Sequence, residues 1–60
     1  MKEIVKKQIL VIRDTGLTNM FDVRNVKDIA EQLEFNELIE YLENHKGDYV
    51  SFILYGKENA

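Results

Sequence analysis

Two apolar patterns with helical spacing occupy the middle of the chain. The first consists of Val26, Ile29, Ala30 and Leu33, and nine residues later the second repeats it as Phe35, Leu38, Ile39 and Leu42. Nine residues of one continuous helix turn the chain through about 900°, which would leave the two patterns on opposite faces. We therefore predict two helices separated by a break near residues 34–36, so that both patterns face one core.

Each helix of this pair has a capping residue in front of it. Asp22 is expected to cap the first helix and Asn36 the second, because their side-chain oxygens accept hydrogen bonds from the free N–H groups of a first turn. Glu37 then lies in the first turn of the second helix, where the helix dipole favours a negative charge.

The N-terminal segment fits a helix of about 12 residues, because Ile4, Val5, Ile9 and Ile12 are apolar and lysines lie between them. The β-branched run 9–12 also fits a buried strand, but the chain offers no convincing partner strand. Gly16 is suited to the left-handed conformation that ends a helix. The apolar connection 17–21 is expected to fold back and plug one end of the core.

Residues 49–56 form the last apolar segment. As a helix it would be capped by Asp48 and ended by Gly56, whereas a lone strand would leave its backbone groups unpaired. We predict an all-α fold of three to four short helices around a single small core, in one domain of residues 1–60. The alternative is an α+β fold with a C-terminal strand or hairpin. The predicted core consists of Ile9, Ile12, Val26, Ile29, Leu33, Leu38, Leu42, Phe52 and Ile53.

Composition and charge narrow the class of protein. The 60 residues include no cysteine, which excludes a disulfide framework and a thiolate metal site. Residues 1–27 carry a formal charge of +3 and residues 28–60 a charge of −6, which together give the net charge of −3. No apolar run approaches the length of a membrane span, and charges stand where a signal peptide needs its apolar region. We expect a cytoplasmic protein that has no membrane partner.

No motif supports catalysis. Asp14-Thr15-Gly16 is the tripeptide of aspartic proteases, but here it follows a predicted helix in a chain far too short for two protease lobes. His45 has only scattered carboxylates near it, whereas zinc sites usually need three or four convergent ligands. We therefore predict that the protein is not an enzyme and that it has no catalytic residue, cofactor or metal.

Binding to a macromolecule is the remaining class of function. A helix-turn-helix interpretation of the two central helices meets an objection, because the second helix presents Glu37, Glu40 and Glu43, which repel phosphate. A nucleic-acid-associated regulator that uses the basic N-terminal segment, or an acidic mimic of nucleic acid, is the alternative function. Direct contact with nucleic acid is disfavoured.

Protein interaction is the leading hypothesis, because a domain of this size cannot bury all of its apolar residues. We expect the unburied ones to be Leu10, Met20, Phe21, Tyr41, Tyr49 and Tyr55. A homodimer that shares residues 52–55 is the alternative to a monomer whose core these residues complete. The candidate interaction residues, for a protein partner of unknown identity, are Met20, Phe21, Glu37, Glu40, Tyr41 and Glu43.

Several segments together resemble a known family. They are Gln8-Ile9-Leu10, Ile12-Arg13, Thr15-Gly16, Thr18-Asn19-Met20-Phe21-Asp22, Ile29-Ala30, and Tyr49 through Phe52-Ile53-Leu54 with Gly56. The family consists of very short proteins of unknown function carried by phages, prophages and mobile islands of Gram-positive bacteria. The resemblance implies a bacterial cytoplasmic setting and an accessory role for a mobile element. It implies no activity, cofactor or catalytic residue.

Overall fold

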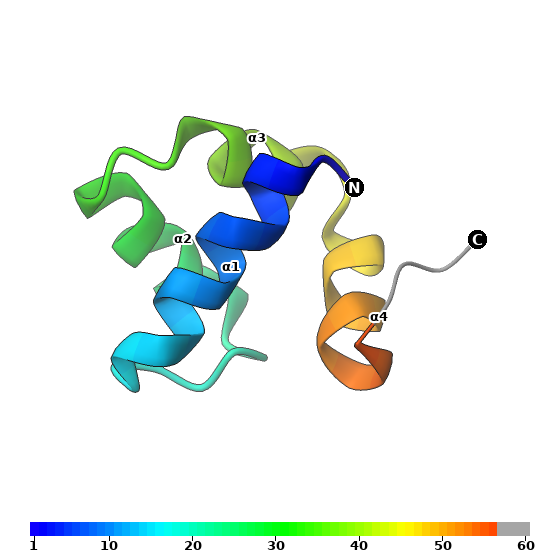
Figure 1. Cartoon of the computed structure of the whole chain (residues 1–60), viewed down its shortest axis with the longest axis horizontal. Coiled ribbons are helices and arrows are strands. Elements are labelled where there is room, and N and C mark those ends of the chain that lie inside the picture. The colour runs from blue at the N-terminus through cyan, green and yellow to red at the C-terminus, as the bar shows by residue number, and fades with distance from the viewer. Residues whose placement is uncertain (57–60) are drawn as a thin grey trace.

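The computed structural model describes residues 1–56, which form four helices. They are α1 (Glu3–Thr15), α2 (Val23–Gln32), α3 (Asn36–Asn44) and α4 (Lys46–Tyr55), as Figure 1 shows. Within this described part there is no strand, so the all-α prediction is confirmed and the C-terminal strand alternative is wrong. The helix predicted for the N-terminal segment is also confirmed.

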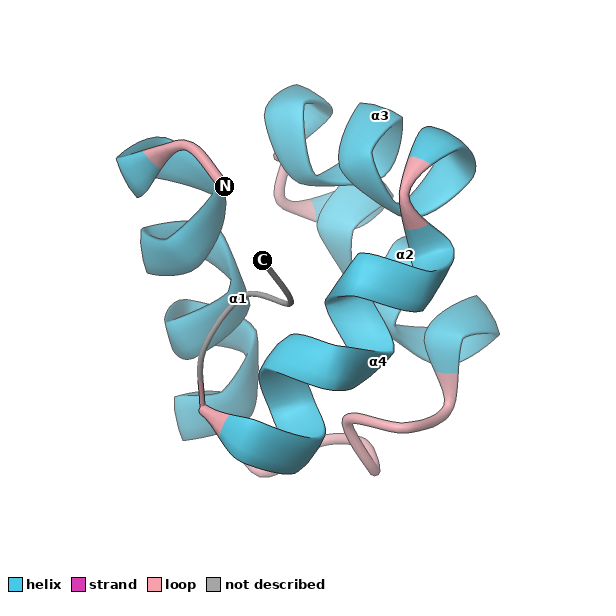
Figure 2. Ribbon diagram, turned by 90° about the vertical axis from the view of Figure 1, so that its right-hand side faces the viewer, coloured by secondary structure: helices cyan, strands magenta, loops and turns pink. Residues whose placement is uncertain are grey.

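Helix α3 is the centre of the arrangement. It packs against each of the other three helices, and α1 packs in addition against α2. Helix α4 lies at one end of the molecule, apart from α1 and α2 in Figure 1 and at the front of Figure 2.

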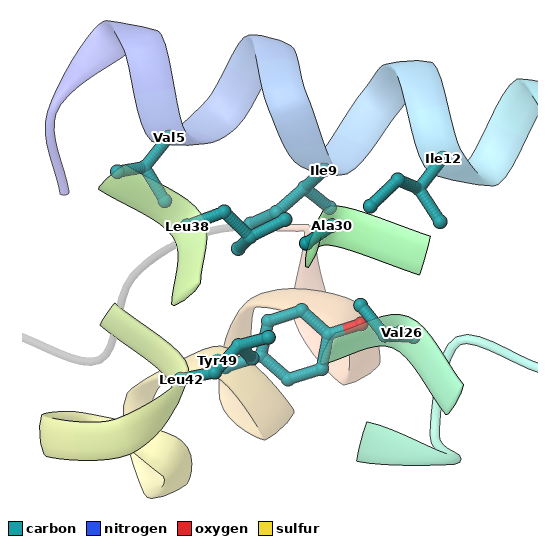
Figure 3. Close-up of a cluster of buried hydrophobic side chains, with 8 residues drawn as sticks. All are labelled: Val5, Ile9, Ile12, Val26, Ala30, Leu38, Leu42 and Tyr49. Carbon is teal, nitrogen blue, oxygen red and sulfur yellow. The ribbon is translucent and has the colours of Figure 1, made fainter. Parts of the chain in front are cut away.

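The core lies between α1 and the other helices, and its buried apolar residues are Val5, Ile9, Ile12, Val26, Ala30, Leu38, Leu42 and Tyr49 (Figure 3). Of the predicted core, Ile29, Phe52 and Ile53 are only half-buried. Leu33 is 44% exposed and does not belong to the core. Leu33 is the C-cap residue that follows the last residue of α2. The chain changes direction at this position, so the Leu33 side chain does not lie in the core.

The prediction that Tyr49 remains unburied is wrong. Its side chain is completely buried, and its hydroxyl donates a 2.7 Å hydrogen bond to the backbone carbonyl of Met20. Figure 3 shows the ring in the core with its oxygen directed toward Val26. Burial raises the pKa of Tyr49 to about 12, because the interior disfavours the phenolate. The satisfied hydroxyl explains why a polar aromatic residue can occupy the core.

The predicted break between the two central helices is a well-defined helix end. Glu34 adopts a φ of 59°, and the N–H groups of Glu34 and Phe35 donate to the carbonyls of Glu31 and Ala30 at 3.2 and 2.8 Å. This pair of bonds is the Schellman arrangement, which usually places glycine where Glu34 lies. The break lets Val26 and Leu38 enter the same core, as the two apolar patterns require.

The connection between α1 and α2 folds back only in part. Gly16 has a φ of 66° and ends α1 as expected. Met20 packs against the core, but Leu17 is 73% exposed and Phe21 49% exposed, so the prediction that this segment plugs the core is wrong for these two residues. Asn19 explains the outcome for Phe21: its side-chain oxygen accepts the Phe21 N–H at 2.9 Å and forms a local turn that needs no apolar burial.

Of the predicted helix caps, Asp22 is confirmed, since its carboxylate accepts the Asn25 N–H at 3.2 Å. Asn36 and Asp48 are wrong, because each lies inside its helix. Helix α3 begins one residue after Phe35, which has no capping side chain, and α4 begins directly after His45, which also ends α3. Asp48 instead contributes a negative charge to the first turn of α4.

Candidate functional site

A buried glutamine joins α1 to the N-terminus of α3. The Gln8 side chain is 6% exposed, and its Oε1 accepts the backbone N–H of Leu38 at 2.9 Å. Its Nε2 donates to Oε1 of Glu37 at 2.8 Å. Since Phe35 offers no side-chain acceptor, Gln8 supplies the capping interaction from another helix. This contact fixes where the first turn of α3 lies relative to α1.

A groove opens beside this contact, with a volume of about 490 Å³. On one side it is lined by Met1, Lys2 and Val5, at the start of the chain and in α1. On the other side it is lined by Glu37, Glu40 and Tyr41 of α3, and His45 lies at the end of that helix. We call this the α1/α3 groove. Three of the six predicted interaction residues meet there.

The acidic wall of the α1/α3 groove is formed by two carboxylates one helical turn apart. Glu37 accepts hydrogen bonds from Gln8 and from its own backbone N–H, and Lys2 is nearby, so the pKa of Glu37 is lower than the ordinary value despite some desolvation. Glu40 is exposed on the same helix. Glu37 therefore presents a fixed negative charge at neutral pH, held in place by a buried partner.

The aromatic end of the groove is formed by Tyr41 and His45. Their ring centroids are 5.3 Å apart at an interplanar angle of 32°. The Tyr41 ring is half-buried and packs against the core, and His45 Nδ1 lies 3.7 Å from an Asp48 carboxylate oxygen. A flat apolar surface thus adjoins the two carboxylates, which is the combination that attracts an organic cation.

The other three predicted interaction residues lie outside this groove. Glu43 is turned toward α2, where its carboxylate lies 3.2 Å from Lys27 Nζ. Met20 lines a second, mostly apolar depression of about 340 Å³ between α1 and α4, together with Leu10 and Phe52. Phe21 lines neither depression. The predicted residues therefore do not form one surface.

Sequence reasoning did not select five residues of the site, namely Met1, Lys2, Val5, Gln8 and His45. Gln8 occupies a position in the apolar spacing of α1, and a polar residue at such a position indicates a buried hydrogen bond. Its partners on α3 were not readable from spacing along the chain, because they lie 29 and 30 positions away.

Among residues 1–56 no group of three histidine or acidic side chains is arranged to hold a metal ion. No helix in that range is both long and apolar enough to cross a bilayer.

Comparison with known proteins gives one match. The profile of a family described as "Domain of unknown function (DUF5049)" matches residues 1–57. No curated protein matches the chain, and no solved structure does.

Proposed function

The chain belongs to the DUF5049 family, and we propose that it is a non-enzymatic protein-interaction module whose α1/α3 groove binds a basic segment of a partner protein. The observation that carries this proposal is the meeting of Glu37 and Glu40 with the Tyr41 ring along one groove. The groove is small, so we infer that it holds a few side chains rather than a whole domain surface.

The electrostatics support a cationic segment. The groove is lined by the carboxylates of Glu37 and Glu40 and by the cationic groups of Lys2 and of the Met1 N-terminus. Outside the groove the chain carries further exposed acids: Asp28 and Glu31 on α2, Glu34 in the break between α2 and α3, and Glu43 on α3, which pairs with Lys27. This field attracts a basic segment over a distance of about 8 Å at physiological ionic strength. The shape of the groove and its local contacts then determine which basic segment binds.

The apolar lining supports a mixed segment rather than a purely basic one. Met1 and Val5 lie opposite Tyr41, so an arginine or lysine bound to the carboxylates would place its aliphatic stem on apolar atoms. Arginine is favoured over lysine, because its planar group both stacks on an aromatic ring and pairs with carboxylates in a bidentate manner.

The biological setting that we propose is the cytoplasm of a Gram-positive bacterium, where the protein acts on a host protein for a phage or mobile element. The similarity of residues 18–22 and the other quoted segments to short mobile-element proteins supports this setting. The neighbours of the coding gene test it. Phage or integration genes on both sides would agree with the proposal, and a conserved housekeeping operon would contradict it.

The binding proposal is tested with a displayed library of random peptides selected on the immobilised protein. We expect the selected peptides to carry arginine or lysine beside an apolar residue. Their affinity, measured by calorimetry, should fall about tenfold for Glu37→Gln/Glu40→Gln. The charge-matched control, Asp28→Asn/Glu31→Gln on α2, should weaken binding by less than about threefold, since exposed distant charges are screened. Equal loss in both variants would contradict a local site.

Duplex DNA provides the test of the alternative function. The exposed carboxylates of α3 predict no binding even at low salt, because affinity for duplex DNA depends on neutralising phosphates. Binding that falls steeply with salt, and that is lost when Lys6 and Lys7 are changed to glutamine, would favour a nucleic-acid-associated regulator instead.

A further inference from the structure

A single histidine lies at the end of the α1/α3 groove. His45 is the one histidine of the chain, and it lines the groove together with Glu40 and Tyr41. Its side chain is 57% exposed, so the ring exchanges protons with solvent. Histidine is the side chain whose charge ordinarily changes between pH 5 and 8. The lining of a groove that attracts cations therefore contains a group that can itself become a cation.

The backbone holds His45 in this place. Its N–H donates to the Tyr41 carbonyl at 2.7 Å, and its carbonyl accepts the Tyr49 N–H at 3.0 Å. Tyr49 is completely buried, so the second bond ties the junction of α3 and α4 to the core. The ring of His45 thus stays beside the ring of Tyr41, with 5.3 Å between the two centroids.

We propose that His45 makes binding in the α1/α3 groove depend on pH, so that the groove holds a basic segment tightly when the imidazole is neutral and less tightly when it is protonated. This inference rests on the proposed function, which takes the bound segment to be cationic. A cation that stacks on Tyr41 lies within about 6 Å of the ring centroid. A protonated His45, 5.3 Å from the same ring, repels that cation, because the screening length at physiological ionic strength is about 8 Å.

The other charged and titratable groups around His45 come from three parts of the chain. They are Glu37, Glu40 and Tyr41 of α3, Lys46, Asp48 and Tyr49 of α4, and Met1 and Lys2 at the start of the chain. Between pH 5.5 and 7.0 carboxylates, phenols and amines keep most of their charge state, whereas imidazole changes its own. Asp48, 3.7 Å from His45 Nδ1, is charged throughout this range, so protonation of His45 adds one positive charge to the groove.

The test is calorimetry of the full chain at pH 7.0 and at pH 5.5, with one ionic strength for both. The probe is an arginine-containing peptide from the library selection, synthesised with blocked ends and without histidine or acidic residues, so that the peptide itself does not titrate. We expect its dissociation constant to be about threefold higher at pH 5.5, because unit charges about 6 Å apart at a surface open to water interact weakly.

Two variants separate the charge of His45 from its shape. His45→Gln cannot take up a proton, so its dissociation constant should change by less than about 1.5-fold between the two pH values. His45→Lys is charged at both, so it should bind about threefold less tightly than His45→Gln at pH 7.0 and should lose nothing further at pH 5.5. Asp28→Asn, an exposed position on α2, is the matched control and should keep the dependence of the unmodified chain. Far-ultraviolet circular dichroism at both pH values checks that each variant keeps its helices.

The same measurements distinguish this inference from the groove function on which it rests. A peptide that Glu37→Gln/Glu40→Gln binds as tightly as the unmodified chain does at pH 7.0 would overturn both. If that double variant weakens binding, equal dissociation constants at pH 5.5 and 7.0 for the unmodified chain would overturn the role of His45 alone. A pH dependence that His45→Gln retains in full would do the same.

Discussion

Gln8 Oε1 accepts the backbone N–H of Leu38 across 2.9 Å, so a residue in the middle of α1 caps the first turn of α3. The donor belongs to a residue whose side chain is fully buried, and water cannot replace the acceptor there. This contact also orients Glu37 and thereby the acidic wall of the α1/α3 groove. The stability of the fold and the geometry of the site thus depend on the same glutamine.

Replacing Gln8 by alanine removes the acceptor and leaves the Leu38 N–H buried without a partner. We expect the free energy of unfolding to fall by about 1–3 kcal/mol, measured by urea denaturation. Lys7→Ala, on the exposed side of α1, is the control and should change stability by less than about 0.5 kcal/mol. An equal effect of the two changes would show that the cap contributes nothing.

Exchanging the amide of Gln8 and the carboxylate of Glu37 tests the hydrogen bond between them, because the double variant should recover stability that the single variant loses. Gln8→Glu alone places a second carboxylate beside Glu37, so this variant should be destabilised at pH 7 and should regain stability as acid protonates one of the pair. The double variant Gln8→Glu/Glu37→Gln restores one amide and one carboxylate, and its stability at pH 7 should exceed that of Gln8→Glu. Thermal unfolding at several pH values measures both. A double variant less stable than the single one contradicts the hydrogen-bond assignment.

The raised pKa of Tyr49 predicts that the folded protein loses stability in alkali. Its pKa in the folded protein is about 12, above the ordinary 10.0, so its contribution is fully present below pH 10 and is lost as the pH rises through 12. Tyr49→Phe should lower the stability at pH 7 by about 1 kcal/mol, since the bond to the Met20 carbonyl is lost. The difference between the two proteins should shrink above pH 10. A constant difference from pH 8 to 12 would be inconsistent with a buried phenol.

Two of the three described positions with a left-handed backbone, Glu34 and Gly16, are expected to respond oppositely to substitution. Glu34 has a φ of 59° without being glycine, so Glu34→Gly should stabilise the protein by about 1 kcal/mol. Gly16 has a φ of 66° with open space around it, so Gly16→Ala should destabilise by a similar amount through the backbone alone. Midpoints of thermal unfolding measure both changes. Stabilisation by Gly16→Ala would contradict the assigned helix end.

The two leucines of the central patterns should respond very differently to truncation. Leu38 is completely buried, and Leu38→Ala should cost about 2–5 kcal/mol, which is enough to unfold much of so small a protein. Leu33 is 44% exposed, and Leu33→Ala should cost less than about 1 kcal/mol. Helical content at 25 °C by circular dichroism distinguishes them. Similar losses would mean that the chain turns at a different residue.

Local spacing was enough to predict the helices and the break between them. The apolar repeats that contain Val26 and Leu38 fixed two helical faces, and Asp22 and Gly16 marked a start and an end correctly. The errors arose where a distant residue changed the outcome. Asn36 lies inside α3 rather than before it, and the first turn of α3 is capped by Gln8, which lies 30 positions from Leu38.

Burial was harder to predict than helix position. Tyr49 was expected to be exposed but is buried, because its hydroxyl has a hydrogen-bond partner 29 positions away. Leu33 was expected in the core but is 44% exposed, because it lies at the end of α2. The site was predicted in part: Glu37, Glu40 and Tyr41 share a helix and a groove. The other wall of the groove, at Lys2 and Val5, depends on how α1 packs across α3. The apolar spacing along the chain does not specify that packing, so this wall could not be predicted.

The binding role of the α1/α3 groove is tested most directly by nuclear magnetic resonance of the ¹⁵N-labelled protein titrated with a selected basic peptide. We predict that the largest shifts fall on the backbone amides of Lys2, Val5, Glu37, Glu40 and Tyr41, and that the same peptide leaves the amides of α4 after Tyr49 nearly unmoved. Largest shifts on α4 or on residues 17–21, or no shift at peptide concentrations that saturate binding in calorimetry, would contradict the proposed site.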